Sequence, residues 1–424
     1  MSRTMKDSGI PWIGEIPSHW DTCFIKQVMR NKSVKGYPDE QVLSLYRDYG
    51  VVPKDSRDDN HNVTSEDTSG YKLVDVGDFV INKMKAWQGS MAVSEYRGII
   101  SPAYYICRFT APVYKKYIHY LLRNETYKAE YMRLSTGLRV GQWDLNVDDF
   151  LHIPMVLPPI PEQQAIADFL DKKCGEIDEM VSLQEKIIEE LKAYKQSVIT
   201  EAVCKGLNPN VPMKDSGVEW IGQIPEGWSI VQTRRIVLSH LQGYYDSDGY
   251  VASGYRLLRI TDLTTNGDID LTAAPFVKET PQISAFLLKQ GDFCFARTGG
   301  AGSFGYVSKD IEPAVFASYL IRFRFIGQHD NYLRYYFLSH SFLNEVYSLI
   351  HGGVNKNIHA DNIKDTHIVL PPLFEQQAIA DYLDTKCSEI DALISLKQSK
   401  IDALKGYKKS IIYEYITGKK EVNG

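Results

Sequence analysis

Apolar residues recur at alternating steps of three and four, or sums of these, in two long stretches, residues 157–206 and 370–419. This spacing is typical of a helix whose apolar stripe needs a partner helix to cover it. The first stripe comprises Ile166, Leu170, Ile177, Met180, Ile187, Leu191, Tyr194 and Val198. The second comprises Ile379, Leu383, Ile390, Leu393, Leu404, Tyr407 and Ile411. Each stretch opens on a Pro-Pro pair and predicts one helix of about 40 residues, roughly 60 Å long, that stops near Gly206 or Gly418.

The two stretches are copies of each other in gapless register, and both contain LPP, EQQAIAD, LD, KC, EID, SL and YK. Two helices with near-identical apolar stripes most simply pack on each other, although each could instead be buried in a separate domain. The repeated stripes favour the first arrangement. The residues that we expect to pair the helices are Ile166, Leu170, Ile177, Leu191, Ile379, Leu383, Ile390 and Leu404.

A second repeat stands at the front of each half, as MKDSGIPWIGEIPSHW in residues 5–20 and MKDSGVEWIGQIPEGW in residues 213–228. The chain is therefore a duplicated unit of entry segment, variable body and long helix. The four expected parts are residues 1–156 (entry segment and first body), 157–206 (first helix), 207–369 (entry segment and second body) and 370–424 (second helix). The two bodies share almost no sequence, although the segments around them are repeated. This pattern favours one kind of function that the two bodies perform on two different targets.

Both bodies show patterns of strands followed by helices. The predicted strands are residues 74–80, 104–109, 288–295 and 318–325, and the first and third include a Gly-Asp turn that enters an apolar strand. The predicted amphipathic helices are residues 115–134 and 331–350. The expected fold class is therefore α+β, with two globular domains joined by two long helices.

Composition limits the class of protein. The chain has 424 residues, 44% of them hydrophobic, and a formal net charge of -5, which argues against a nonspecific polyanion binder. We expect no signal peptide and no membrane span, because no apolar run is long enough. The six cysteines show no CxxC spacing, which fits a cytoplasmic protein with reduced thiols.

Matched polar loops in the two bodies are the candidate DNA-binding elements. Arg, Lys, Gln and Asn read base edges, and Lys with backbone NH groups holds phosphates. The candidates in the first body are Lys83, Lys85, Trp87, Gln88, Arg139, Gln142 and Trp143. Those in the second body are Arg297, Thr298, Ser303, Asn355, Lys356 and Asn357. Each of these residues could equally belong to an ordinary polar loop, but their occurrence as a matched set favours binding.

Motifs for catalysis and cofactor binding are missing from the sequence. Gly300, Gly302 and Gly305 satisfy GxGxxG, but no helix pattern follows them, so we reject a dinucleotide or S-adenosylmethionine site. There is no GxxxxGK[ST] phosphate loop, and the ten histidines show no metal-ligand spacing. We therefore expect no catalytic residues, no metal site and no cofactor bound by this chain.

The duplicated MKDSGxxWIGxIPxxW segments, the duplicated EQQAIAD helix openings and the dissimilar bodies between them resemble the specificity subunit of type I restriction-modification systems. This resemblance covers essentially the whole chain. It implies that each body is a target-recognition domain for one half of a split DNA site, and that the two helices pair antiparallel as a spacer. It also implies that the chain is a non-catalytic subunit.

The resemblance further implies two methyltransferase (modification) subunits and restriction subunits as partners, with S-adenosylmethionine, ATP and Mg²⁺ on those partners. Since the two bodies differ, we expect an asymmetric site with two unrelated half-sites. A tandem duplication with antiparallel helices also predicts pseudo-twofold symmetry, like that of dimers on palindromes.

Two rival classes stay open from the sequence. The first is a stand-alone nuclease or methyltransferase, which the missing motifs disfavour. The second is a coiled-coil scaffold that binds protein only, which the matched polar loops disfavour. An orphan specificity subunit without a restriction partner is a further alternative within the family.

Overall fold

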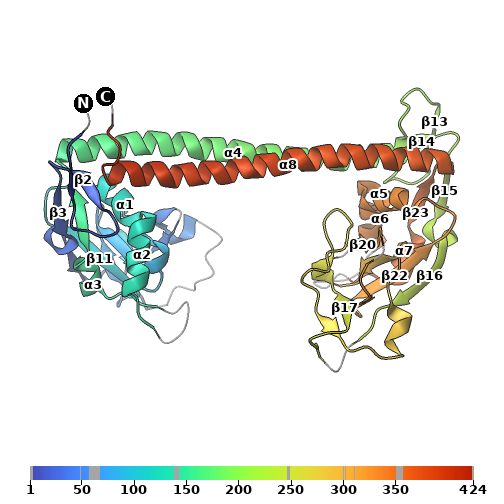
Figure 1. Ribbon diagram of the computed structural model, residues 1–424, viewed down its shortest axis with the longest axis horizontal. Helices are drawn as coiled ribbons and strands as arrows, with labels where there is room; N and C mark the ends of the chain where they lie inside the picture. Colours follow the sequence, from blue (N-terminus) through green and yellow to red (C-terminus); the bar gives the residue numbers. More distant parts are fainter. Residues whose placement is uncertain are drawn as a thin grey trace. The chain divides into compact units, whose positions relative to one another are not determined.

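The computed structural model describes residues 3–47, 49–56, 67–137, 143–245, 249–298, 300, 302–309, 311–349 and 357–422 (Figure 1). The chain forms two compact units. Unit 1 comprises Met1–Gln184 and Ser399–Gly424, and unit 2 comprises Glu185–Gln398. Two long helices, α4 (Ile160–Lys205) and α8 (Leu373–Ile416), each contribute one part to each unit.

Unit 1 begins with the hairpin of β1 (Met5–Asp7) and β2 (Glu15–Pro17). The strands of its body are β3 (Asp21–Phe24), β4 (Met29–Lys32), β5 (Leu43–Tyr46), β6 (Gly50–Pro53), β7 (Lys72–Val74), β8 (Phe79–Asn82), β9 (Met91–Val93), β10 (Gly98–Ile100), β11 (Tyr104–Phe109) and β12 (Pro154–Leu157). The helices of its body are α1 (Lys115–Arg123), α2 (Glu125–Leu134) and α3 (Val147–Leu151), with the short 3-10 helix η3 (Ala86–Gln88) after β8.

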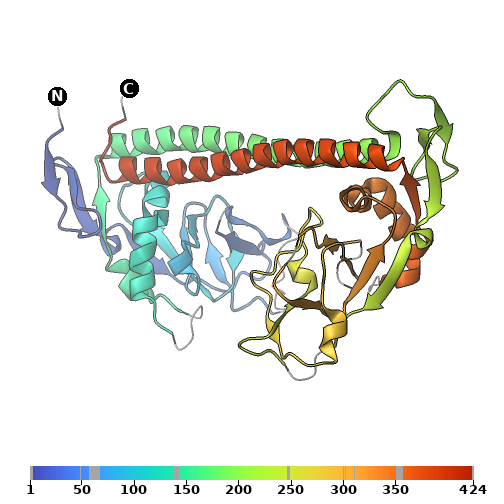
Figure 2. The ribbon, with the colours of Figure 1, turned by 45° about the vertical axis from the view of Figure 1, so that its right-hand side comes forward.

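Unit 2 has a similar order of elements. Its strands are β13 (Met213–Asp215), β14 (Gln223–Pro225), β15 (Ser229–Gln232), β16 (Val237–Gln242), β17 (Tyr255–Leu258), β18 (Phe276–Val277), β19 (Phe293–Ala296), β20 (Phe304–Tyr306), β21 (Ala314–Phe316), β22 (Leu320–Phe325) and β23 (His367–Leu370). Its further helices are α5 (Asp330–Leu338), α6 (His340–Leu349) and α7 (Ala360–Asp365). Within unit 2, α5 and α6 lie beside the long helices (Figure 2).

The central sheets of the two bodies have the same strand order. In unit 1 the order is β4-β11-β8-β9, and in unit 2 it is β16-β22-β19-β20, antiparallel throughout. The last body strand pairs with the first in each unit, as β12 with β3 and β23 with β15. The chain therefore leaves each body beside its point of entry, where the long helix begins.

The Gly-Asp turn before the inner strand has the same role in both sheets. Buried Asp78 accepts hydrogen bonds from the Asp75 backbone NH (2.9 Å) and from the Lys32 ammonium (2.5 Å). Buried Asp292 accepts from the Lys289 backbone NH (2.9 Å) and from Arg324 Nε (2.5 Å). Charge-assisted bonds to another strand of the same sheet, β4 in unit 1 and β22 in unit 2, stabilise the carboxylate and tie the turn to the sheet.

The helices predicted within the bodies each divide into two. In residues 115–134, Asn124 adopts an extended conformation and its side chain accepts from Thr126 NH (2.9 Å), which starts α2. In residues 331–350, Ser339 interrupts the helix in the same way and accepts from Phe342 NH (3.3 Å). Side chains that cap a new helix compete with continuation of the old one.

The long helices start and stop where the sequence predicts. Their starts, Ile160 and Leu373, follow the Pro-Pro pairs, and Gly206 and Gly418 adopt positive φ values of 79° and 72°. A Cβ atom on Gly206 would stand 2.9 Å from the Trp228 ring. One on Gly418 would stand 3.0 Å from the Trp20 ring. Glycine is therefore needed at both ends for conformation and for close packing against an entry segment.

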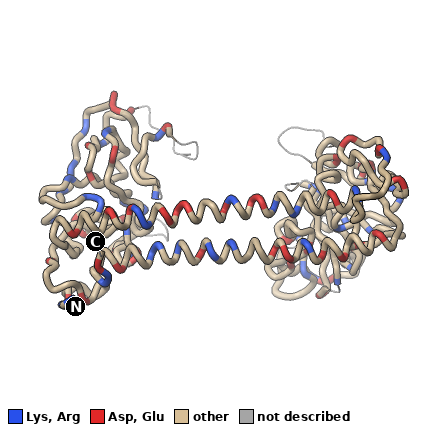
Figure 3. The backbone as a smooth tube through the Cα atoms, turned by 90° about the horizontal axis from the view of Figure 1, so that it is seen from above, with Lys and Arg blue, Asp and Glu red and all other residues tan. Residues whose placement is uncertain are grey.

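The helices pair antiparallel. In unit 1, Phe169 contacts Tyr415 (4.4 Å between ring centroids) and Asp178 accepts from Lys408 (2.6 Å), so rising numbers on α4 meet falling numbers on α8. In unit 2, Lys195 donates to Asp391 (2.7 Å), and these residues are the repeat counterparts of Lys408 and Asp178. Charges of both signs recur along both helices (Figure 3). The expected fold class, two α+β units with paired long helices, is confirmed.

The predicted apolar stripe was partly wrong. Ile166, Leu170, Ile177, Ile379, Leu383 and Ile390 are buried, and Leu191 and Leu404 are half-buried. Four stripe members, however, are exposed: Met180 (41%), Tyr194 (56%), Leu393 (46%) and Tyr407 (56%). The buried face of α4 follows a strict four-three alternation through Cys174, Ile177, Val181, Gln184 and Ile188. The prediction placed Met180 on this face, three residues after Ile177. The heptad pattern requires a step of four residues at that point, which leads to the buried Val181 instead.

Candidate nucleic-acid interface

A repeated glutamine attaches each body to its long helix. The Gln163 side chain accepts from the Tyr114 backbone NH (2.9 Å) and donates to the Pro158 carbonyl (2.8 Å). Its counterpart Gln376 accepts from the His329 backbone NH (2.9 Å) and donates to the Pro371 carbonyl (2.9 Å). Both glutamines are 1% exposed, so each satisfies two polar groups that water does not reach.

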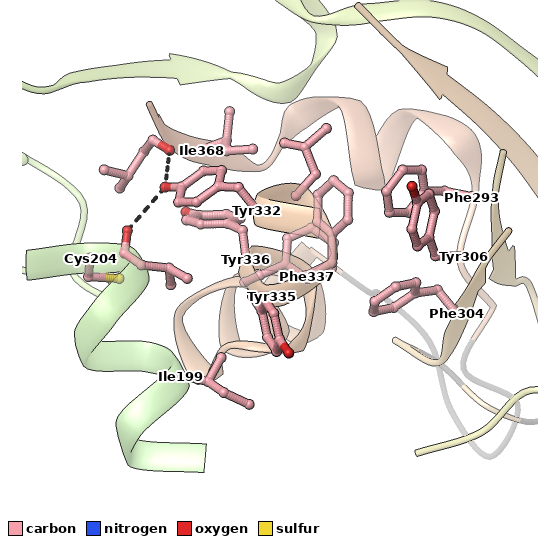
Figure 4. Close-up of a cluster of buried hydrophobic side chains, with 14 of the residues drawn as sticks. Ile199, Cys204, Phe293, Phe304, Tyr306, Tyr332, Tyr335, Tyr336, Phe337 and Ile368 are labelled. Atoms are coloured by element: carbon pink, nitrogen blue, oxygen red, sulfur yellow. Dashed lines mark hydrogen bonds between the residues drawn. The ribbon is translucent and has the colours of Figure 1, made fainter. Parts of the chain in front are cut away.

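Repeated tyrosines complete the attachment. Tyr332 donates to the Val203 carbonyl (3.2 Å) on α4 and to the Val369 carbonyl (2.7 Å) on β23, within a cluster of aromatic side chains (Figure 4). Tyr117 donates to the carbonyls at the matching repeat positions of unit 1, Ile416 (3.0 Å) and Val156 (3.4 Å).

One helical turn further on, Tyr120 and Tyr335 donate to Asp171 and Asp384, each at 2.7 Å. The same contacts therefore hold each body on the parts of the long helices that belong to its own unit.

In unit 1, the candidate residues after β8 meet the segment after residue 142. Leu145 NH donates to the Lys83 carbonyl (3.1 Å), and Lys83 Nζ lies 3.2 Å from Asp144. Trp87 contacts Trp143 edge to face, with 5.4 Å between ring centroids, and donates to the Met84 carbonyl (3.1 Å). Lys85 is exposed, and Gln88 is half-buried in η3. The structure thus brings Lys83, Trp87 and Trp143 together.

Unit 2 has the matching arrangement after β19. Ile358 NH donates to the Arg297 carbonyl (2.8 Å), the equivalent of the bond between Leu145 and Lys83. Asn357, exposed, thus lies in the chain segment beside Arg297. Ser303, also exposed, accepts through its carbonyl from Ala296 NH (2.8 Å), and Thr298 is half-buried. Arg297, Ser303 and Asn357 therefore gather near the end of one inner strand.

Four further candidates, Arg139, Gln142, Asn355 and Lys356, lie outside the described residues. The rejected glycine motif lies around a strand, since Gly305 belongs to β20. A dinucleotide site requires a helix there.

Exposed tyrosines in unit 2 were missed by sequence reasoning. Tyr245, Tyr250 and Tyr319 are 74%, 65% and 57% exposed, and the Tyr319 carbonyl accepts from Arg297 NH (2.8 Å). Exposed aromatic rings offer stacking surfaces for bases. The run GYYDSDGY at 243–250 was the available signal, because tyrosines among turn-forming residues have little core to enter.

A lysine group in unit 1 was also missed. The pKa of Lys72 is lowered, first by burial and then by the charges of Lys35 and Lys83. Its ammonium donates to the carbonyls of Pro102 (3.2 Å) and Tyr104 (2.7 Å), and it lies 5.5 Å from the Tyr105 ring centroid. Three like charges within interaction range make this end of the sheet favourable for an anion.

A family model, the type I restriction modification DNA specificity domain, matches residues 17–193 and 251–405, most of the chain. The chain belongs to this family. It is a specificity subunit of the type I restriction-modification class, and DNA target recognition is the family's role.

Curated relatives of this specificity subunit include two from Methanocaldococcus jannaschii. The MjaVIII specificity subunit of a type I restriction enzyme is 28% identical over 312 residues, which is 71% of this chain and 69% of the relative. The putative MjaX specificity subunit is 24% identical over 442 residues, which is 96% of this chain and 95% of the relative.

Two solved structures share the fold. A chain from a study of complex assembly and conformational transition in the type I R-M system has a TM-score of 0.72 at 14% identity, covering 95% of this specificity subunit and 98% of that chain. The HsdS subunit from Thermoanaerobacter tengcongensis has a TM-score of 0.51 at 15% identity, with the same two coverages.

Membrane spans and metal clusters are both absent from the described residues. None of the helices found there is both long and apolar enough to cross a membrane. In the same ranges, no group of three or more His, Cys, Asp or Glu side chains could hold a metal ion.

Proposed function

We propose that the two bodies read the two halves of a bipartite, asymmetric DNA site, and that the chain thereby directs adenine methylation and restriction of DNA by its partner subunits. The observation that carries this proposal is the shared sheet order with different side chains at the loop ends, Lys83 and Trp87 in one body and Arg297 and Asn357 in the other. Side chains of different hydrogen-bonding type discriminate different base pairs.

The paired helices set the separation of the two half-sites in this proposal. By analogy with dimeric proteins on palindromes, the half-site centres lie about one helical turn, about 10 bp, apart. Inserting four residues into one helix lengthens it by about 6 Å and rotates the part of the helix beyond the insertion. Such an insertion should therefore change the spacer between the half-motifs.

Exposed apolar residues on the long helices support the docking of a methyltransferase subunit. The buried face of each long helix, with its alternating steps of four and three residues, leaves a second apolar stripe exposed to solvent. The members of this exposed stripe occupy equivalent repeat positions in the two units. They are Met180, Leu183 and Tyr407 in unit 1 and Leu393, Leu396 and Tyr194 in unit 2, all 41–64% exposed.

The polar residues beside this stripe are duplicated as well. Lys173 pairs with Glu176 in unit 1 and Lys386 with Glu389 in unit 2, each at 2.8 Å. Exposed apolar patches with a polar rim are typical of protein interaction sites. Duplicated patches suit two copies of one partner, and we assign them to two modification subunits.

In this proposal the partner subunits bind the cofactors and catalyse the reactions. S-adenosylmethionine belongs to the modification subunits, and ATP and Mg²⁺ belong to restriction subunits in the full complex. This chain supplies recognition and docking and catalyses no step. An orphan specificity subunit that directs methylation alone is the variant of this function without a restriction partner.

The test is co-expression with the host methyltransferase subunit in a strain that lacks adenine methylation, followed by methylation-sensitive long-read sequencing. One split motif with a fixed spacer is the expected result. Co-purification without new methylation would leave a protein-binding scaffold, and turnover of S-adenosylmethionine or DNA by the isolated chain would show a stand-alone enzyme.

A further inference from the structure

Unit 1 contains an open pocket of about 1320 Å³ between its body and the paired long helices. Side chains of η3, α1 and α2 line the body side, and residues of α4 and α8 line the other side. The loop side chain of Arg47 also reaches the pocket. All of these residues belong to unit 1.

The pocket is basic, although the chain as a whole is acidic. Six lining residues are basic: Arg47, Arg123, Lys128, Lys405, Lys408 and Lys409. Three are acidic: Glu125, Asp171 and Asp178. The formal charge of the lining is therefore +3, against -5 for the whole chain. A concave site lined mainly by one sign of charge concentrates the field and attracts ions of the opposite sign.

Unit 2 fills the equivalent place with its own chain. Residues 264–268 connect strands of the second body, and Asn266 Oδ1 accepts from Lys195 (2.9 Å) beside Asp391. Arg334 donates to the Asn266 carbonyl (2.8 Å) and to the Asp268 carboxylate (3.0 Å). Oxygen atoms of this loop thus accept hydrogen bonds from Lys195 on α4 and from Arg334 on α5.

Several residues around the unit 1 pocket are counterparts of residues that contact this loop. Lys408 and Asp178 correspond to Lys195 and Asp391 by the repeat register. His119 corresponds to Arg334, one position before the matched Tyr120 and Tyr335. In the described part of unit 1, Lys408 and Asp178 hydrogen-bond to each other, without a loop like 264–268 over them. The pocket of unit 1 therefore corresponds to the place that the loop 264–268 occupies within unit 2.

The pocket is continuous with the loop after β8, which carries candidate DNA-binding residues and is called the reading loop of unit 1 below. Trp87 and Gln88 line the pocket, and the same segment carries Lys85 and the contact of Trp87 with Trp143. A DNA strand that leaves the reading loop presents phosphates at the regular spacing of its backbone. Lys409 lies 3.5 Å from Glu125, and its side chain is 65% exposed, so a phosphate can still approach its ammonium.

We propose that this pocket binds backbone phosphates of the DNA that flanks the half-site read by unit 1, and that unit 2 has no equivalent phosphate site. The inference rests on the proposed DNA-reading function. Phosphate contacts are independent of base sequence, so they add affinity and salt dependence without altering the motif. The two halves of the complex thus contribute unequally to electrostatic binding.

The test variant is Lys405→Gln with Lys409→Gln, in the chain assembled with its methyltransferase subunit. DNA affinity is measured between about 50 and 200 mM salt on fragments with and without the motif. The slope of log affinity against log salt concentration is negative, and each lost phosphate contact makes it less steep by about 0.9. The slope of the double variant should therefore be less steep by about 1.8. The motif from long-read sequencing should not change.

Two controls define the result. Lys192→Gln alters the repeat counterpart of Lys405 in unit 2 and should leave the slope unchanged. Lys405→Arg with Lys409→Arg keeps both charges and should retain the slope, with an unchanged unfolding midpoint as the check on folding.

Some outcomes overturn the inference. An unchanged slope in the glutamine double variant contradicts phosphate binding. Loss of methyltransferase co-purification with an unchanged slope would instead identify an acidic protein segment as the occupant. If the wild-type complex yields no split motif, the proposed function fails, but the slope on fragments without a motif still decides whether the pocket holds phosphates.

Discussion

The loop after β8 in unit 1 presents Lys83, Lys85 and Trp87, whereas the loop after β19 in unit 2 presents Arg297 and Thr298. Beneath these loops, the sheets have the same strand order and are bound to the long helices by the same glutamine, tyrosine and aspartate contacts. We call the entry segments and the two long helices the frame. The residues that hold a body on the frame are therefore the same in both copies, while the residues at the outer loops of the bodies differ.

The contacts of the frame also give a reason for the repeated EQQAIAD segment that lies within the chain. Glu162 pairs with Arg3 and His19 of the first entry segment, and Glu375 accepts from the Trp228 indole NH (2.9 Å) of the second. The next residue, glutamine, caps α1 or α5 in each unit. Both copies of the segment thus hold the entry segment and the body of their own unit, which gives a reason for their identity besides any shared partner.

The largest expected effect comes from removing the buried glutamine. Gln163→Ala leaves the Tyr114 NH and the Pro158 carbonyl without a partner, and Gln376→Ala does the same in unit 2. We expect each variant to lose about 3 kcal/mol of local stability. Hydrogen exchange should rise in α1 for the first variant and in α5 for the second. Equal protection of both helices in either variant would contradict the equivalence of the two attachments.

Low pH should destabilise the two units to different extents, because unit 1 has His119 at the position where unit 2 has Arg334. The pKa of His119 is lowered to about 3 by burial, then by Arg123, against an opposing effect of Asp171. Between pH 6.5 and about 3 the unfolded chain therefore binds more protons, so the free energy of unfolding falls as the pH falls.

The contribution of His119 to this slope reaches about 1.4 kcal/mol per pH unit. His119→Gln should remove that contribution. Hydrogen exchange in α1 between pH 7 and 4 measures it, with α5 as the internal control. An equal pH dependence of α1 in the variant and in the unaltered chain would rule out this role for His119.

Reading-loop variants should affect one half-site each. Arg297→Ala should cost about 1 to 3 kcal/mol of discrimination at one position of one half-motif, roughly 5- to 150-fold. Trp87→Ala should weaken the other half-motif only. Methylation frequency at single-base variants of each half-motif is the readout, and a change in both halves from one substitution would refute the division of labour.

The ion pairs of the helix seam should show the smallest difference. Lys195→Met should destabilise unit 2 by about 1 to 2 kcal/mol, since Lys195 is 14% exposed and also binds Asn266. Lys408→Met should cost under about 1 kcal/mol, because Lys408 is 30% exposed and its partner Asp178 is 62% exposed. Urea unfolding of the two variants compares them, and a larger loss for Lys408→Met would contradict the contribution of the Asn266 loop.

Much of the framework was predictable from sequence, because the period, the start and the stop of a long helix are all encoded locally. The exceptions were Met180, Tyr194, Leu393 and Tyr407, where apolar character alone could not tell the buried face of the helix from an exposed stripe one residue away. The division of residues 115–134 at Asn124 was missed because a capping asparagine resembles any polar helix residue until its partner is known.

The candidate site was harder to predict. Sequence spacing placed Lys83 and Arg297 after strands, but only the fold brings Lys83 beside Leu145 and Arg297 beside Ile358. Lys72 and Tyr319 come from other strands and loops of their sheets, so their proximity to these loops has no local signature. The contrast between the pocket of unit 1 and the loop 264–268 of unit 2 likewise depends on contacts between distant segments.

The central claim is that each body reads one half-site independently on a common frame. Its most direct test replaces residues 229–369 by residues 21–156, so that both frames carry the same body, and then maps methylation by long-read sequencing with the methyltransferase partner. The account predicts an inverted repeat of one half-motif with an unchanged spacer. A complex that co-purifies intact yet methylates the original asymmetric motif, or a motif unrelated to either half, would contradict it.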